Sequence, residues 1–366
     1  MERAPLGECN VDLWNVWTTL MSSNSLDFEE PIQIVIKRIE VLKLRPRTPE
    51  RHEELQQLQL KLDVLKKEIY SNLSPWQQVL VARHPDRPHT LDYVDHIFSE
   101  FTEFHGDRRF GDDPAIVCGL AYLQEDPVVV VGHQKGRGTR DNIRRNFGYA
   151  RPEGYRKALR AMRLAEKFER PVVVFVDTPA AYPGLDSEER GVAEAIATNL
   201  REMSMLKVPI IVVISGEGGS GGALGLAVGD RVLIQEHSIY SVIPPEGCAA
   251  ILWRDQEAKV SAAEALKITA SDLLELKVVD EIIPEPLGGA HVDAKTAAQN
   301  VKRSIVENLN AISQTGIDEL LSSRYDKYRR MGDVGLTTRT ADSPKITEDR
   351  KANSGISKRE GTESVR

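Results

Sequence analysis

A cluster of glycines between a predicted strand and a predicted helix is the part of this sequence best suited to chemistry. Its members are Gly216, Gly218, Gly219, Gly221 and Gly222. The β-branched run at residues 210–214 before them predicts a buried strand. Glycines at such a junction leave backbone N–H groups uncovered and let a ligand approach closely. Because these groups and the positive helix end favour negative charge, the cluster predicts an active site or a phosphate cradle.

A dinucleotide-binding turn is one alternative interpretation of the cluster. Gly216, Gly218 and Gly221 match the pattern G-x-G-x-x-G, and Glu236 stands where the ribose-binding acid of that turn would be. The helix after the cluster ends by Gly229, however, which makes it too short for that fold. A tight buried turn without any chemistry is the second alternative.

A serine hydrolase is the third alternative. Gly218, Ser220 and Gly222 match G-x-S-x-G, the turn that exposes a nucleophilic serine. Asp280 and His291 then follow in hydrolase order. The cluster holds more glycines than such a turn needs, and nothing further marks His291 as a base. The hydrolase therefore stays an alternative to the main interpretation.

A second turn of the same kind precedes the glycine cluster. It spans residues 177–184, Asp-Thr-Pro-Ala-Ala-Tyr-Pro-Gly, between a predicted strand at 171–176 and a helix that starts near Glu188. Consecutive strand–turn–helix units open their turns at one end of a sheet and build a single crevice. Two sets of N–H donors suit a reaction in which an acyl oxygen becomes an enolate. Glu194, Asn199 and Glu202, on the helix that follows, are expected to face water.

Residues 132–170 are strongly basic, although the whole chain carries a net charge of −7. Such contrast indicates an anionic ligand, such as a phosphate-bearing molecule or an acidic protein. The cations expected to bind it lie in a glycine-bounded loop and are Lys135, Arg137, Arg144 and Arg145. The cations expected on a solvated helix face are Arg160, Arg163, Lys167 and Arg170. No signature of a nucleic-acid-binding fold accompanies them, so no nucleic acid is predicted.

Composition fits a large α/β enzyme without a membrane span. The chain has 366 residues with a hydrophobic content of 41%. No apolar run approaches the ~20 residues that cross a bilayer. Only three cysteines occur, Cys9, Cys118 and Cys248, and none forms a C-x-x-C pair. This usage predicts a reducing compartment, the cytoplasm, and no metal site in the chain.

The sequence predicts four parts. Residues 26–75 form a helical hairpin, because apolar residues recur at helical spacing on both sides of Pro46 and Pro49. We expect this hairpin to clamp a neighbouring subunit, and the alternative is a helix pair packed on its own domain. Residues 76–331 form the α/β domain, and residues 332–366 lack the apolar content to fold and are expected to be disordered. Residues 1–25 are an extension of doubtful status, with Met21 as the alternative start.

Several segments together resemble one known family, the alpha subunits of bacterial-type acetyl-CoA carboxylase carboxyltransferases. The matching segments occur in one order at residues 82–85, 133–137, 144–148, 152–158, 177–184, 216–223, 245–249 and 284–291. The resemblance extends from about Leu26 to Met331. It implies a crotonase-like spiral of ββα units and transfer of a carboxyl group from carboxybiotin to acetyl-CoA, giving malonyl-CoA for fatty acid biosynthesis.

The resemblance also implies partners. A beta subunit carries a zinc ribbon and forms an α2β2 heterotetramer with this chain, which is inactive alone. Biotin reaches the site on a biotin carboxyl carrier protein, and a separate biotin carboxylase component consumes ATP. Acyl-CoA specificity is then set largely by the beta subunit. A non-catalytic scaffold for the beta subunit is the remaining alternative.

The family's site residues carry over to the two turns. The resemblance makes Gly221 and Gly222 the backbone N–H donors to the biotin ureido oxygen. It places the substrate against Gly218, Gly219, Ala180, Ala181 and Gly184. Ala180 stands where the family has glycine. If this position needs a positive φ, alanine adds roughly 1 kcal/mol of strain or bends the loop, whereas a tolerated alanine implies a negative φ. A valine at Gly222 is expected to block the reacting atoms without unfolding the chain.

Overall fold

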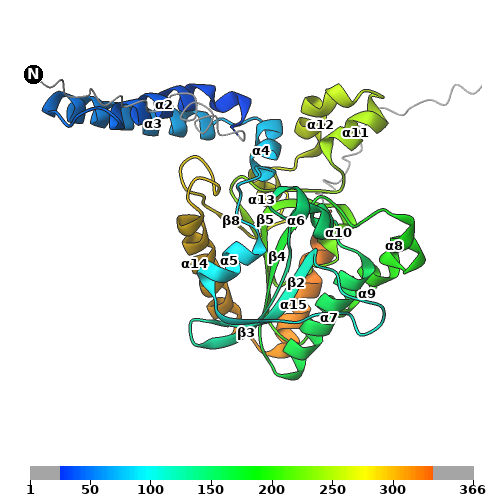
Figure 1. Cartoon of the computed structure of the whole chain (residues 1–366). Helices are drawn as coiled ribbons and strands as arrows, with labels where there is room; N and C mark the ends of the chain where they lie inside the picture. The colour runs from blue at the N-terminus through cyan, green and yellow to red at the C-terminus, as the bar shows by residue number, and fades with distance from the viewer. Residues whose placement is uncertain (1–24, 333–366) are drawn as a thin grey trace, which may run out of the picture. The chain divides into compact units, whose positions relative to one another are not determined.

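The computed structural model describes residues 25–332, and its residues up to Arg329 form one compact unit (Figure 1). The expected extension up to residue 24 and the expected tail from residue 333 lie outside the described residues. No helix among residues 25–332 has the length and apolar character to cross a bilayer.

An eight-stranded mixed sheet forms the core. Its strands are β1 (Ser99–Glu103), β2 (Ile116–Leu123), β3 (Asp126–His133), β4 (Val172–Thr178), β5 (Ile210–Gly219), β6 (Arg231–Gln235), β7 (Ile239–Ser241) and β8 (Glu281–Ile283). They lie in the order β1-β2-β3-β4-β5-β6-β8, with β7 paired to β5. Pairing is antiparallel from β1 to β3 and parallel from β3 onward. The chain segments that follow β3, β4 and β5 therefore meet at one edge.

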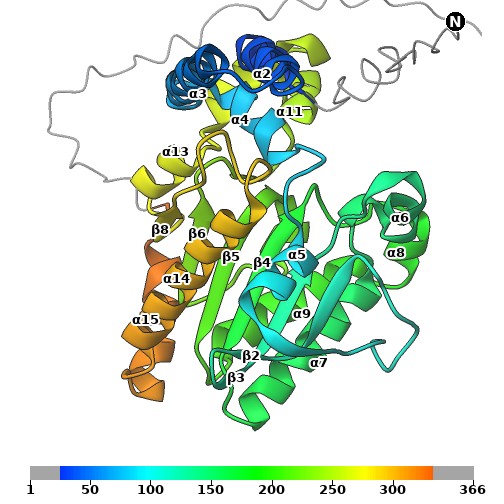
Figure 2. The ribbon, with the colours of Figure 1, turned by 60° about the vertical axis from the view of Figure 1, so that its left-hand side comes forward.

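Helices cover both faces of this sheet, and a further group of helices extends beyond one end of it (Figure 1 and Figure 2). They are α2 (Glu30–Lys43), α3 (Pro49–Tyr70), α4 (Pro75–Ala82), α5 (Thr90–Ile97), α6 (Gly138–Arg144), α7 (Pro152–Lys167), α8 (Leu185–Glu189), α9 (Val192–Met205), α10 (Ser220–Leu224), α11 (Pro245–Leu252), α12 (Lys259–Leu266), α13 (Ala270–Glu275), α14 (Ala294–Ile312) and α15 (Ile317–Arg330). Figure 2 shows α5 and α14 on one face of the sheet and α7 and α9 on the other.

The central strands are apolar throughout because both of their faces are covered. Every residue of β4 and β5 is buried. Alternate residues enter different clusters: Val174 packs with α7 and α9, whereas Val173 and Phe175 pack with α5 and α14. Such burial explains the near-continuous β-branched runs, which are typical of parallel strands.

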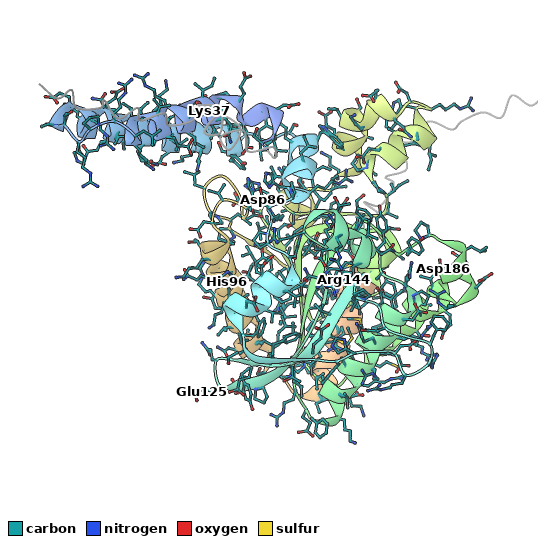
Figure 3. The ribbon with its side chains drawn as sticks, viewed as in Figure 1. Lys37, Asp86, His96, Glu125, Arg144 and Asp186 are labelled. Carbon is teal, nitrogen blue, oxygen red and sulfur yellow. The ribbon has the colours of Figure 1, made fainter. Side chains whose placement is uncertain are left out.

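The hairpin helices α2 and α3 pack on each other through Ile32, Val35 and Leu62. Thr48 caps α3 by accepting a hydrogen bond from the N–H of Arg51. At the base of the hairpin, the Tyr70 hydroxyl donates to Glu29 Oε1 over 2.6 Å. The exposed surface of the hairpin carries charged side chains such as Lys37 on α2 (Figure 3) and also apolar ones such as Ile34 and Leu60.

Helix α15 closes the compact unit through Arg324, whose side chain is fully buried. Its guanidinium pairs with Asp230 at 2.7 Å. It also donates to the carbonyl oxygens of Met203, Leu206 and Val208. One side chain thus ties the last helix to the end of α9 and to the entry of β5.

Two boundaries differ from those expected. Strand β5 does not stop near residue 214 but continues to Gly219, because Glu217, Gly218 and Gly219 pair with β7. The helix expected near Glu188 begins at Leu185 and is divided by Gly191, whose φ is +78°. The first difference arises from the pairing of β5 with β7, and the second from the left-handed conformation of Gly191.

Candidate active site

The chain turns sharply from β5 into α10 at Ser220. This serine has a φ of +52°, a left-handed conformation that a non-glycine residue rarely adopts. The N–H groups of Gly221 and Gly222, in the first turn of α10, have no acceptor among the residues that the structure describes. Unbonded N–H groups at a helix start favour a negatively charged oxygen. The sequence-predicted donors are therefore free to bind one.

The second turn lies directly against α10. A Cβ atom on Gly222 would stand 2.3 Å from the Ala181 nitrogen and 2.4 Å from the Ala180 carbonyl carbon. A Cβ on Gly219 would stand 1.7 Å from the Pro179 oxygen. Only glycine permits this approach, so the glycines bring the two turns into backbone contact.

This geometry corrects the expected effect of a side chain at Gly222. Its missing Cβ faces the backbone of the neighbouring turn rather than open space. At Gly221, by contrast, the nearest atom to an added Cβ is Ile196 Cδ1 at 3.9 Å. Gly222 therefore serves turn packing, and Gly221 is the glycine whose side-chain position is open.

Ala180 fits its position without strain. It is absent from the described residues with positive φ, so the alanine takes a conformation open to any residue. No hydrogen bond within residues 25–332 uses the N–H of Ala180 or Ala181. Tyr182, one residue on, donates its N–H to the Ala150 carbonyl and anchors the turn. Gly184 ends the turn as the N-cap residue of α8.

Buried polar side chains of α7 and α9 hold α10 in place through hydrogen bonds. The Tyr155 hydroxyl, from α7, donates to the Gly222 carbonyl oxygen at 3.2 Å. Asn199 Nδ2, from α9, donates to the carbonyl oxygens of Tyr155 and Gly225 at 3.1 Å each. Burial raises the pKa of Tyr155, which keeps the phenol protonated as a donor. A five-residue helix rich in glycine gains its fixed orientation from these contacts.

The structure thus corrects the expectation that the Asn199 side chain faces water. Its side chain is fully buried, whereas Glu194 on the same helix is exposed and Glu202 pairs with Arg163. The reason is helical position: Asn199 points inward between α7 and α10, where two carbonyl oxygens need a donor.

His133, at the end of β3, is a further buried group near α10. Burial lowers its pKa to about 4, while the Asp177 carboxylate and the carbonyls of Gly222 and Phe175 act in the opposite direction. The ring is therefore neutral at neutral pH. Neither ring nitrogen has a hydrogen-bond partner, although the residue is fully buried.

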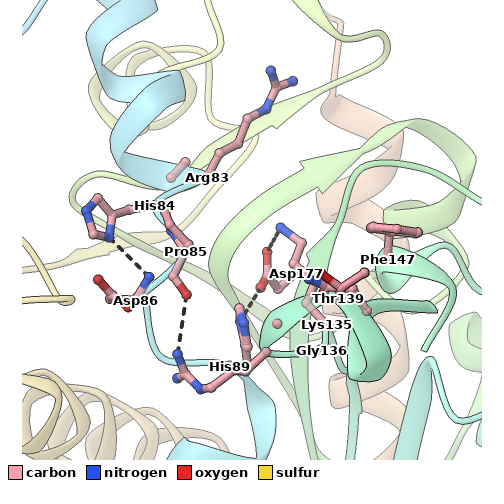
Figure 4. A pocket seen from close by; sticks show the side chains of 14 residues that line it. Arg83, His84, Pro85, Asp86, His89, Lys135, Gly136, Thr139, Phe147 and Asp177 are labelled. Carbon is pink, nitrogen blue, oxygen red and sulfur yellow. Dashed lines mark hydrogen bonds and ion pairs between the residues drawn. The ribbon is translucent and has the colours of Figure 1, made fainter. Parts of the chain in front are cut away.

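Ion pairs connect the segments after β3 and α4 with β4 and β5, and Figure 4 shows the one between Lys135 and Asp177. Lys135 Nζ is 2.6 Å from Asp177 Oδ1 and 3.8 Å from Glu217 Oε2. Arg83 also pairs with Glu217, at 2.7 Å. Burial opposes ionisation of Asp177, but Lys135 and a contact with His89 hold the pKa of its carboxyl well below the usual range. The charge on Lys135 is therefore already compensated within the chain.

The other loop cations have different surroundings. Arg137 pairs with Asp92 at 2.6 Å and lines, with Lys135, a cavity of about 520 Å³. Arg145 is largely buried and donates to the Pro114 carbonyl. Arg144 is exposed on α6 and shares Asp141 with Arg145 (Figure 3). Arg144 is thus the most accessible of the four for an incoming anion.

The alternative interpretations find little support in this geometry. Asp280 accepts hydrogen bonds from Lys327 and from the Val232 N–H, and His291 stacks on His84 with ring centroids 3.9 Å apart. No hydrogen bond among the described residues joins Ser220 to either of them. The dinucleotide interpretation fails because α10 has five residues.

Sequence reasoning missed the groups that hold the turns: Tyr155, Asn199, His133, Arg83 and Glu217. In the sequence, these residues are marked only by their place: each lies in or beside a segment shared with the family, or on a helix face that is buried. Their roles depend on contacts across the chain, such as Arg83 with Glu217. No cluster of metal-ligating side chains occurs within residues 25–332.

Comparison with known proteins places this arrangement in a family. The model of the acetyl co-enzyme A carboxylase carboxyltransferase-like family matches residues 25–332. The acetyl-coenzyme A carboxylase carboxyl transferase subunit alpha of Geobacter metallireducens is 56% identical over 313 residues, covering 85% of this chain and 98% of the relative. That of Halalkalibacterium halodurans is 52% identical over 315 residues, covering 85% and 96%.

Solved structures agree on the fold. Transcarboxylase 12S, with methylmalonyl-coenzyme A and methylmalonic acid bound, aligns with a TM-score of 0.52 at 20% identity, over 62% of this chain and 42% of that one. A Pseudomonas malonate decarboxylase hetero-tetramer in complex with coenzyme A aligns with a TM-score of 0.50 at 18% identity, over 61% and 91%. The fold is thus crotonase-like, and the chain belongs to the acetyl-CoA carboxylase carboxyltransferase family, whose matched relatives are alpha subunits.

Proposed function

We propose that this chain is the alpha subunit of an acetyl-CoA carboxylase carboxyltransferase. In this role it moves a carboxyl group from carboxybiotin, presented by a biotin carboxyl carrier protein, to acetyl-CoA and forms malonyl-CoA. The observation that carries the proposal is the set of unbonded N–H groups of Gly221 and Gly222 beside the turn at Ala180 and Ala181. The reaction belongs to fatty acid biosynthesis, in the cytoplasm.

The chain's contribution is backbone hydrogen bonding. When carboxybiotin gives up its carboxyl group, negative charge develops on the ureido oxygen, and the N–H groups of Gly221 and Gly222 are placed to bind that oxygen. Loss of one such donor typically costs about 3–4 kcal/mol of transition-state stabilisation. Gly218, Gly219, Ala180, Ala181 and Gly184 shape the two turns around the donors. No side-chain nucleophile is needed, because the ureido nitrogen freed by loss of the carboxyl group takes the proton that the methyl group of acetyl-CoA gives up.

The chain supplies only one half of the reaction. The thioester oxygen of acetyl-CoA needs its own donors, which we assign to a zinc-ribbon beta subunit in an α2β2 assembly. Exposed apolar side chains support coverage by a partner: Val242, Ile251 and Leu252, around α11, are 74%, 69% and 68% exposed. ATP is used by a separate biotin carboxylase component, and biotin arrives on its carrier.

The test is reconstitution. The purified chain alone should form no malonyl-CoA from carboxybiotin and acetyl-CoA, and adding the beta subunit should restore transfer. The control mixes the beta subunit with a Gly221→Val chain, which keeps the partner surface but fills the donor site. Transfer by the isolated chain, or full transfer with Gly221→Val, would contradict the proposal.

A further inference from the structure

A basic groove lies away from the two turns, between α7, α9 and the loop at residues 105–112. Its volume is about 540 Å³. Its basic lining residues are Arg108, Arg109, Arg156, Arg160, Arg163 and Lys167. Only two acidic residues, Asp107 and Glu194, line it as well. A concave surface with such an excess of positive charge attracts anions.

The acidic residue nearest the cations is neutralised internally. Asp107 Oδ1 accepts the backbone N–H groups of Arg109, Phe110 and Gly111, while Oδ2 accepts from Arg156 Nε at 2.8 Å. The charges of Asp107 and Arg156 therefore compensate each other. The three backbone hydrogen bonds to Asp107 hold the loop segment that carries Arg108 and Arg109.

Those two arginines have no partner of their own. The guanidinium groups of Arg108 and Arg109 make no hydrogen bond or ion pair within residues 25–332. Arg108 is also held at a φ of +63°, a conformation that costs a non-glycine residue about 1–3 kcal/mol.

The opposite wall supplies further donors. Arg160 Nε is buried without a hydrogen-bond partner, while its Nη2 donates to the His105 carbonyl. Arg163, one turn further along α7, pairs with Glu202 at 2.8 Å, and Lys167, two turns further, is exposed. Cations spaced along a helix and facing a loop can contact several negative groups at once. A cavity of this size admits a small molecule, whereas a protein surface would need a broad, shallow area.

We propose that this groove binds a small anion that carries two or more linked phosphate groups. Arg108 and Arg109 contact one end of the ligand, and Arg160 and Lys167 contact the other. The groove also reaches Asn199, whose Nδ2 supports α10 through Gly225. An occupant would therefore adjoin a residue that positions the proposed N–H donors. The inference concerns binding and does not depend on the proposed function.

The experiment titrates the full chain with sodium tripolyphosphate at low salt and follows the heat of binding. Orthophosphate is the single-phosphate comparison. The test variant is Arg108→Gln with Arg109→Gln, because neither side chain makes contacts that folding needs. The matched control is Arg140→Gln with Arg170→Gln, which removes the same charge from exposed sites outside the groove. Circular dichroism checks that all chains fold alike.

We expect one bound tripolyphosphate per chain, at least about tenfold tighter than orthophosphate. The test variant should weaken it by about tenfold or more, and the control by less than about twofold. If coenzyme A displaces tripolyphosphate, the ligand of the groove is a coenzyme. If only nucleoside triphosphates displace it, the ligand is a nucleotide. Absence of binding, equal weakening in both variants, or binding only of an acidic carrier protein would overturn the inference.

Discussion

The hydroxyl of Tyr155 reaches from α7 to the carbonyl oxygen of Gly222, 3.2 Å away, and so connects a core helix to the peptide chain of the proposed donors. Gly222 and Ala223 share the peptide group whose oxygen Tyr155 binds. Its orientation fixes the first turn of α10, where the donor N–H groups lie. Tyr155 is therefore a positioning residue for the proposed site.

Tyr155→Phe removes this hydrogen bond and little volume. We expect kcat for carboxyl transfer to fall about three- to tenfold, because a buried carbonyl loses a donor worth about 1 kcal/mol and the turn relaxes. KM for acetyl-CoA should not change. The exposed Tyr325→Phe is the control. A fall in thermal stability with kcat intact would show that Tyr155 serves the core alone.

Gly221 and Gly222 should respond differently to the same substitution. Gly222→Ala places a Cβ against the backbone of Ala180 and Ala181, so we expect lower thermal stability as well as lost transfer. Gly221→Ala meets only Ile196 Cδ1 at 3.9 Å and should fold normally. We expect kcat to fall because the methyl group is bonded to the Cα atom next to the proposed donor N–H. Differential scanning fluorimetry and a transfer assay separate the two. Equal behaviour of both variants would contradict this division of roles.

Ser220 is expected to act through its backbone only. Ser220→Ala should keep activity within about tenfold, because the assigned donors are N–H groups. Ser220→Gly should fold at least as well, because glycine adopts the observed φ of +52° without strain. A fluorophosphonate probe that labelled Ser220 would instead support the hydrolase alternative.

Arg144 is the loop cation expected to meet an anionic substrate or carrier. Arg144→Gln should raise an apparent KM and weaken its dependence on salt, since fewer charges are neutralised on binding. Arg145→Gln should mainly lower stability, because Arg145 is buried on the Pro114 carbonyl. Arg140→Gln is the exposed control on the same helix. An unchanged KM at low salt would leave Arg144 as a solvated charge.

Acid should destabilise the chain through buried His133. Its pKa is lowered by burial to about 4, against roughly 6.5 in an unfolded chain. Between these values the unfolded state binds more protons, so stability falls as pH decreases from 6.5 to 4, by up to about 3 kcal/mol from this group. His291, with a pKa lowered by burial to about 3, acts in the same direction.

Urea unfolding across that pH range measures the effect. His133→Gln should flatten the dependence, because glutamine stays neutral throughout. The control is His96→Gln, at an exposed position of α5. An identical pH slope in the wild type and His133→Gln would show that His133 does not take up a proton on unfolding.

Much of the site could be predicted from sequence because its signals are local. The β-branched runs of β4 and β5, and the glycines that follow β5, appear in consecutive residues. The supporting contacts are not local: Tyr155 finds its acceptor 67 residues away, and Arg83 finds Glu217 at a separation of 134. Asn199 was misjudged for the same reason. A polar helical residue is expected in water unless its distant partners are known.

Arg324 also sets a condition on synthesis of the chain. The Asp230 side chain is 5% exposed, and apart from the Ile210 N–H its carboxylate has no strong partner until Arg324 in α15 has been made, 94 residues later. An unpaired buried charge costs roughly 3–5 kcal/mol, a large share of the stability of a typical domain. A ribosome-released fragment that ends before Arg324 would therefore stay incompletely folded and open to proteases. Helix α15 must therefore be synthesised before the compact unit can fold completely.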